Sequence, residues 1–160
     1  MKKITFVFLA SLLASSVSAG VAEKKARQAA EEGIASAQAS MKSACGNANV
    51  EVVIAWDQVD AMITKNSALI AEKNSKSEWI YAEVGDRTKA TLEALGKICA
   101  EDADYKEEIA KLTKVSVTPK EKYDDVDSVF ALDGTTLNVQ NGFYMSRSAS
   151  DFVGPLKALY

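Results

Sequence analysis

The two cysteines are the side chains of this sequence whose chemistry is easiest to define. Cys45 and Cys99 lie far apart in a chain of 160 residues, so they do not form the Cys-x-x-Cys motif typical of redox enzymes. Two cysteines in an exported chain are more often joined than free. The sequence therefore predicts a structural Cys45–Cys99 disulfide rather than a catalytic dithiol.

Most familiar catalytic chemistry is excluded because the chain contains no histidine. This removes Ser-His-Asp and Cys-His catalysis, His general bases and His-based zinc or copper sites. Adjacent carboxylates such as Glu31-Glu32 and Glu107-Glu108 point apart on a helix. A glycosidase needs two carboxylates facing each other across a cleft. We therefore expect no catalytic residues and no cofactor, and keep a carboxylate-dependent cell-envelope hydrolase as a remote alternative.

Four aspartates give the C-terminal third of the chain a local acidic density: Asp124, Asp125, Asp127 and Asp133. Calcium is the cation that such oxygen ligands suit. An EF-hand loop, however, requires acidic or amide residues at alternate positions, then Gly and a later Glu, and this stretch does not fit that spacing. We expect a solvated loop without a bound metal, with calcium binding as the alternative.

Large side chains gather between two polar segments near the C-terminus. Phe143, Tyr144 and Met145 follow Asn141-Gly142 and precede a serine-rich stretch that contains Arg147. Aromatic, Met and Arg side chains are enriched at protein interfaces. We take these four residues as a candidate partner-binding segment, while core packing of residues 143–145 remains the alternative.

Aromatic side chains also lie at or near the apolar faces of two segments with helical periodicity, about 50–73 and about 75–99, the second and third predicted helices. These are Trp56, Trp79 and Tyr81, and core packing is the simplest use for them. A small-ligand pocket between helices, lined by these three side chains, is the functional alternative.

The first nineteen residues read as a secretory signal peptide. Lys2 and Lys3 precede a mostly apolar run, and Val17 and Ala19 occupy the small-residue positions of a cleavage site. The predicted mature chain, 20–160, retains 17 basic and 22 acidic side chains. We expect a periplasmic or secreted protein that has no electrostatic attraction to nucleic acid or to an anionic membrane.

Helical periodicity covers the first two-thirds of the mature chain. Small residues form a stripe on one face of the first predicted helix, namely Ala22, Ala26, Ala29, Gly33, Ala37 and Ala44. Gly46 is expected to end this helix. The predicted helices span residues 21–45, about 50–73, about 75–99 and about 104–114.

The pattern changes to strands after residue 114. Residues 115–118 alternate like a strand, and apolar runs at 129–132 and 137–139 flank Asp133-Gly134, which is a strong hairpin signal. Ser150 or Asp151 is expected to cap a last short helix, with Pro155 in its first turn.

These elements predict a mainly α fold, namely an antiparallel three- to four-helix bundle with a small C-terminal antiparallel β-hairpin element. We expect one domain over residues 20–160, with the bundle in 20–114 and the hairpin and short helix in 115–160. Short connections favour an up-down-up arrangement, in which the first and third helices end at the same end of the bundle. That arrangement brings Cys45 close to Cys99 and agrees with the disulfide.

The functional expectation is a non-enzymatic binding protein that engages another exported protein, as an inhibitor, an escort or an immunity-like protein. It depends on the missing histidine, the acidic charge and the aromatic segment at 143–145. A small-ligand carrier with a pocket between the helices is the alternative.

Overall fold

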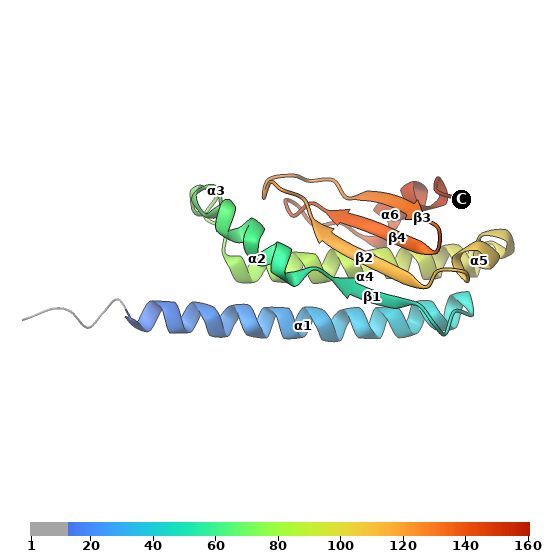
Figure 1. Ribbon diagram of the computed structural model, residues 1–160, viewed down its shortest axis with the longest axis horizontal. Coiled ribbons are helices and arrows are strands. Elements are labelled where there is room, and N and C mark those ends of the chain that lie inside the picture. The colour runs from blue at the N-terminus through green and yellow to red at the C-terminus, as the bar shows by residue number, and fades with distance from the viewer. Residues whose placement is uncertain (1–12) are drawn as a thin grey trace, which may run out of the picture.

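The computed structural model describes residues 13–160, with side chains from residue 20 onward. The fold is mainly helical, as predicted, and carries a four-stranded mixed sheet (Figure 1). In chain order the elements are α1 (Leu13–Cys45), β1 (Glu51–Ile54), α2 (Trp56–Lys65), α3 (Ser67–Glu72), α4 (Ser77–Glu101), α5 (Ala103–Ile109), β2 (Lys114–Pro119), β3 (Val129–Asp133), β4 (Thr136–Asn141) and α6 (Ala149–Lys157).

Most of the predicted signal peptide falls on residues 1–12, which lie outside the described residues. Residues 13–19 form the beginning of α1. None of the helices within residues 13–160 combines the length and the apolar character needed to cross a membrane.

The two long helices α1 and α4 lie side by side and run in the same direction (Figure 1). Ala30 of α1 meets Gly85 of α4, and further along both helices Cys45 is bonded to Cys99. The C-terminal ends of the two helices therefore meet, as the up-down-up arrangement requires. The predicted disulfide is confirmed, with an S–S distance of 2.11 Å.

Small residues allow α1 and α4 to approach closely. A Cβ built on Gly85 would lie 2.5 Å from the Cβ of Ala30, closer than two carbons can pack. Ala30 and Ala37 are buried here, whereas Ala29, which the predicted stripe included, is exposed. The face of α1 that packs on α4 is therefore rotated slightly from the predicted one.

The segment that connects α1 to α4 contains both a strand and helices. The prediction of one helix over residues 50–73 is wrong, because residues 51–54 form strand β1, and α2 and α3 follow as separate helices. The segment Glu51-Val52-Val53-Ile54 is rich in β-branched residues, which favour a strand. Its partner strand β2 lies far along the chain, so the pairing leaves no signal in the local sequence.

The sheet has the strand order β1-β2-β4-β3. The β1–β2 and β2–β4 pairs are parallel, and only the β3–β4 pair is antiparallel. The predicted hairpin at Asp133-Gly134 is present, with Asp133 opposite Thr136. It is the edge of a larger mixed sheet rather than a separate element, so the predicted simple bundle with an isolated hairpin does not describe this fold.

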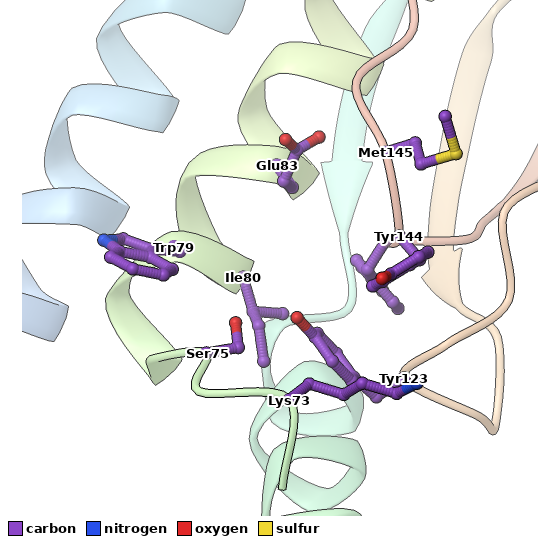
Figure 2. A pocket seen from close by; sticks show the side chains of 9 residues that line it. Lys73, Ser75, Trp79, Ile80, Glu83, Tyr123, Tyr144 and Met145 are labelled. Carbon is purple, nitrogen blue, oxygen red and sulfur yellow. The ribbon is translucent and has the colours of Figure 1, made fainter. Parts of the chain in front are cut away.

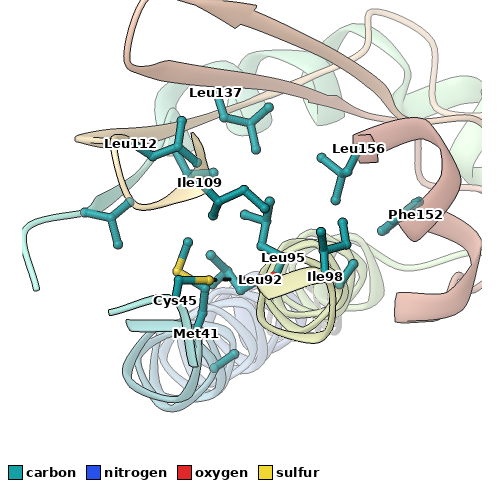
Figure 3. Close-up of a cluster of buried hydrophobic side chains, with 14 of the residues drawn as sticks. Met41, Cys45, Leu92, Leu95, Ile98, Ile109, Leu112, Leu137, Phe152 and Leu156 are labelled. Atoms are coloured by element: carbon teal, nitrogen blue, oxygen red, sulfur yellow. Dashed lines mark hydrogen bonds between the residues drawn. The ribbon is translucent and has the colours of Figure 1, made fainter. Parts of the chain in front are cut away.

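Buried side chains form two core clusters along α4. The first core cluster surrounds the disulfide and joins α1, α4, α5, α6 and one face of the sheet (Figure 3). Its members include Met41, Cys45, Leu92, Leu95, Ile98, Cys99, Ile109, Leu137, Val139, Phe152 and Leu156. The second core cluster lies toward the N-terminal end of α4 and consists of Ala30, Trp56, Val59, Met62, Ile70, Ile80, Tyr81, Val84, Tyr123 and Phe143.

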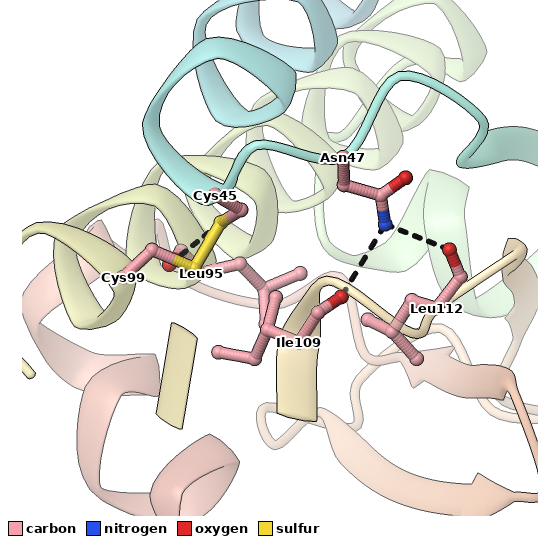
Figure 4. Close-up of a disulfide and its surroundings, with 6 residues drawn as sticks. All are labelled: Cys45, Asn47, Leu95, Cys99, Ile109 and Leu112. Carbon is pink, nitrogen blue, oxygen red and sulfur yellow. Dashed lines mark hydrogen bonds between the residues drawn. A yellow bond between two sulfur atoms is a disulfide. The ribbon is translucent and has the colours of Figure 1, made fainter. Parts of the chain in front are cut away.

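The buried side chain of Asn47 joins the turn after α1 to the segment after α5 (Figure 4). Its Nδ2 donates to the carbonyl oxygens of Ile109, at 3.3 Å, and Leu112, at 2.7 Å. Its Oδ1 accepts from the backbone N–H groups of Asn49 and Val50, each at 3.0 Å. Every polar atom of this amide is therefore used to hold the entry to β1 beside the entry to β2.

We expect removal of the disulfide to destabilise the protein strongly. The double variant Cys45→Ala/Cys99→Ala releases a loop closed between residues 54 positions apart. The chain-entropy model predicts a free energy of unfolding lower by about 4 kcal/mol. Guanidinium denaturation of the variant and of the oxidised native protein measures the difference. Equal unfolding free energies would contradict a stabilising role for the bond.

Two glycines of α4 give a matched test of the helix contact. Gly85→Ala forces a methyl group against Ala30 and should lower the free energy of unfolding by about 1–3 kcal/mol. Gly96→Ala places its Cβ 3.6 Å from the Cα of Met41, which is ordinary contact. The control should instead gain up to about 1 kcal/mol from helix propensity. If both variants were equally stable in thermal or chemical denaturation, the close approach at Gly85 would not be a constraint.

Candidate functional site

A groove with a cavity volume of about 220 Å³ opens beside the N-terminal half of α4 (Figure 2). Three segments distant in sequence form it: the α3–α4 turn with the start of α4, the loop before β3, and the loop after β4. The lining side chains are Lys73, Ser75, Trp79, Ile80, Glu83, Tyr123, Phe143, Tyr144 and Met145.

The floor and the rim of the groove differ in exposure. Ile80, Tyr123 and Phe143 are buried members of the second core cluster and form the floor. Trp79, Tyr144 and Met145 form the rim and are 52%, 40% and 61% exposed. Among the described residues six large apolar side chains are exposed, and half of them meet at this groove.

The structure divides the predicted partner-binding segment. Phe143 is buried in the second core cluster, whereas Tyr144 and Met145 reach the surface of the groove. Arg147 does not line the groove, and its guanidinium forms an exposed ion pair with Asp127 at 3.2 Å. Phe143 is therefore a core residue, whereas Tyr144 and Met145 are surface residues.

The three aromatic residues considered as a ligand pocket do not share one hollow. Trp56 packs on Tyr81 with ring centroids 5.9 Å apart, and the Tyr81 hydroxyl donates to Asp60 at 2.6 Å. Trp56 also lines a separate hollow between α1 and β1. Trp79 instead joins Tyr144 in the groove, a combination that the sequence analysis missed.

A buried arginine of α4 holds the two loops of the groove together. Arg87 has an exposed fraction of 0%. Its guanidinium donates to the carbonyl oxygen of Val126 at 2.7 Å and to Ser128 Oγ at 3.3 Å, both in the loop before β3. It also donates to the carbonyl oxygens of Tyr144, at 3.2 Å, and Met145, both in the loop after β4. One helical side chain thus fixes the loop backbone that carries Tyr144 and Met145.

Sequence reasoning missed Arg87, although a signal exists. Arg87 lies one turn after Val84 on the inner face of the predicted third helix, where an unpaired cation is costly. A charged residue on an apolar helix face indicates either a buried polar network or a site.

The two loops are also bonded directly to each other. The backbone N–H groups of Phe143 and Tyr144 donate to the carbonyl oxygen of Asp125 at 2.8 and 3.1 Å. A Cβ on Gly142 would lie 2.5 Å from that same oxygen, so this position requires glycine. The groove is therefore built on cross-linked backbone rather than on free loops.

Met145 has a left-handed backbone conformation, with φ of 74°. This region is unfavourable for a residue with a long side chain and persists only where neighbouring structure enforces it. The bond from Arg87 to the Met145 carbonyl oxygen supplies that constraint. The strained backbone places the Met145 side chain at the surface of the groove.

Glu83 is the carboxylate among the lining residues. Its Oε1 accepts from Ser146 Oγ at 3.2 Å, and its Oε2 lies 3.9 Å from Arg87 Nε. Burial raises the pKa of the Glu83 carboxyl, and the nearby Arg87 and the Ser146 hydroxyl oppose that change. Burial likewise lowers the pKa of the Arg87 guanidinium. One oxygen of Glu83 is thus bonded to its own protein, while the buried Oε2 faces Arg87 without a hydrogen bond.

Two lysines lie over the aromatic rim. Lys73 Nζ is 5.8 Å from the ring centroid of Tyr144, and Lys76 Nζ is 5.5 Å from that of Trp79. Both distances fall within the range of cation–π attraction. Each of these two exposed rings therefore has a lysine ammonium group beside it.

The structure does not gather the acidic residues considered for calcium into one cluster. Asp127 pairs with Arg147, and Asp133 lies at the end of β3. Within the described part of the chain no group of three or more Asp, Glu, Cys or His side chains is placed to hold a metal ion.

Comparison with protein-family models, curated proteins and solved structures finds no match to this chain.

We expect Arg87 to be essential for the loop arrangement. Arg87→Lys keeps the charge but loses the planar group that bonds both loops, and it should lower the free energy of unfolding by about 3 kcal/mol. Arg147→Lys, at the exposed pair with Asp127, should change it by less than about 0.5 kcal/mol. Equal effects in urea denaturation would show that the buried bonds contribute no more than a surface pair.

Proposed function

We propose that this chain is an exported, non-enzymatic binding protein that engages another exported protein through the groove. In this role it acts as an inhibitor, an escort or an immunity-like protein. Trp79, Tyr144 and Met145 form the contact surface, with Ile80 and Phe143 as its floor. The convergence of three exposed apolar side chains from two distant segments is the observation that carries the proposal.

The composition of the rim supports a protein partner. Interfaces are enriched in Trp, Tyr and Met, and a few aromatic anchors provide most of the binding energy. Exposed apolar groups that gather in one hollow indicate an interaction site more strongly than the same groups scattered over a surface.

The rigidity of the groove supports the same role. Arg87 and the Asp125 carbonyl oxygen hold the loop of Tyr144 and Met145 in place before any partner arrives. A preorganised surface loses little conformational entropy on binding, so more of the contact energy contributes to affinity.

Two features support an exported location. The disulfide is consistent with an oxidising compartment outside the cytosol. Residues 1–19 carry the charge, apolar and small-residue pattern of a signal peptide. We propose the periplasm, or secretion beyond it, as the place of action.

The test uses a groove variant that should leave the fold intact. Tyr144→Ala/Met145→Gly removes two rim side chains, and Gly suits the left-handed backbone at position 145. With the oxidised 20–160 protein as bait, exported extract should yield a stoichiometric partner by mass spectrometry. The groove variant should bind that purified partner at least tenfold more weakly, as expected on losing interface anchors worth about 2 kcal/mol.

Val129→Ala is the matched control, because Val129 is 50% exposed on strand β3 and does not line the groove. It should bind the partner with native affinity. Circular dichroism and thermal unfolding establish that all the proteins are folded. A folded groove variant that retains native affinity would refute the proposal.

A further inference from the structure

We infer that the groove recognises an acidic segment of its partner, in which one large apolar side chain is flanked by Asp or Glu. This inference rests on the proposed function and specifies the chemistry of the bound segment. The apolar side chain lies between Trp79 and Tyr144 over Ile80, and the flanking carboxylate faces Lys73.

The size and lining of the hollow suit one large apolar side chain. A dry apolar cavity of about 150 Å³ is known to take up benzene, and the groove has about 220 Å³. Aromatic walls stand on opposite sides, with Trp79 on one side and Tyr144 on the other, as Figure 2 shows. This space accepts one aromatic or large aliphatic side chain.

The groove leaves one charged side chain without an ion-pair partner among the described residues. Two charged side chains line it, Glu83 and Lys73, and they lie at opposite ends (Figure 2). Glu83 already accepts from Ser146 and faces Arg87. Among the described residues no carboxylate oxygen lies within 4.0 Å of Lys73 Nζ. Lys73 is therefore the charge available to a ligand, and it favours an anion.

The positions of two lysines favour the same kind of ligand. Asn74, between Lys73 and Ser75, has a φ of 50°, which fixes the turn that carries Lys73 to the rim. Lys76 adds a second ammonium on the same side, over Trp79, with Glu78 4.0 Å away as a weak partner. Two cations beside two aromatic rings suit an apolar side chain with carboxylates next to it and repel a basic segment.

The experiment compares dye-labelled peptides of matched length by fluorescence anisotropy. The acidic probe is dye-Gly-Asp-Phe-Asp-Gly-amide, and the neutral probe replaces both Asp residues by Asn. A basic probe carries Lys at the same positions, and dye-Gly-Gly-Gly-Gly-Phe, with a free C-terminus, tests a terminal carboxylate. We expect the acidic probe to bind about fivefold more tightly than the neutral one at low ionic strength. The difference should shrink as salt is added.

Lys73→Gln should remove most of the preference for the acidic probe and leave the affinity for the neutral probe unchanged. Lys89→Gln is the control, because Lys89 is an exposed lysine of α4 paired with Glu93 outside the groove lining. That variant should keep the full preference.

The outcomes separate this inference from the proposed function. If the acidic and neutral probes bind equally well, the inference is wrong. If the Tyr144→Ala/Met145→Gly variant binds neither of them, the groove is still a binding site. Preference for the basic probe, or binding of the free-carboxylate probe alone, also overturns the inference. If no probe binds and the captured partner ignores the groove variant, both the inference and the proposed function are wrong.

Discussion

The contact between α1 and α4 is the constraint on which the rest of the structure depends. Two long helices run in the same direction with their backbones close enough that Gly85 leaves no room for a Cβ. Because α1 and α4 are parallel, the chain that connects them must run back along their length before α4 can begin. β1, α2 and α3 form that path, and the disulfide fixes the ends that it brings together. The position of β1, and with it the first strand pair, follows from this arrangement.

Other elements pack on two sides of α4. One side packs on α1, and the other carries the sheet, α6 and the two loops of the groove. Arg87 is the point at which a helical side chain controls loop backbone. A guanidinium bonded to carbonyl oxygens of both loops positions Tyr144 and Met145 more firmly than local turn chemistry would.

Local signals in the sequence were sufficient for much of the fold. Gly46 ends the first long helix in a left-handed conformation, and Asp133-Gly134 marks the hairpin, as predicted. The apolar periodicity of residues 80–99 predicted α4, and the expected alignment of the helix ends agreed with the disulfide. These features depend on neighbours a few residues away, which a sequence displays directly.

Features built from distant partners could not be read in the same way. The segment 51–54 fits a helix by spacing and a strand by composition, and its pairing with residues 114–117 decides between them. The groove brings Trp79 beside Tyr144 because Arg87 holds a remote loop against α4. The core or surface position of residues 143–145 likewise depends on that loop, so it could only be left open.

The separation of the two core clusters has a consequence for how the molecule moves. The covalent bond belongs to the first cluster, and the groove belongs to the second, at the other end of α4. Opening of the groove end therefore does not require the disulfide end to lose its packing, so the two ends can act as separate cooperative units. A partner bound at the groove would add stability to one unit, while the other, with its covalent bond, keeps the helices in register.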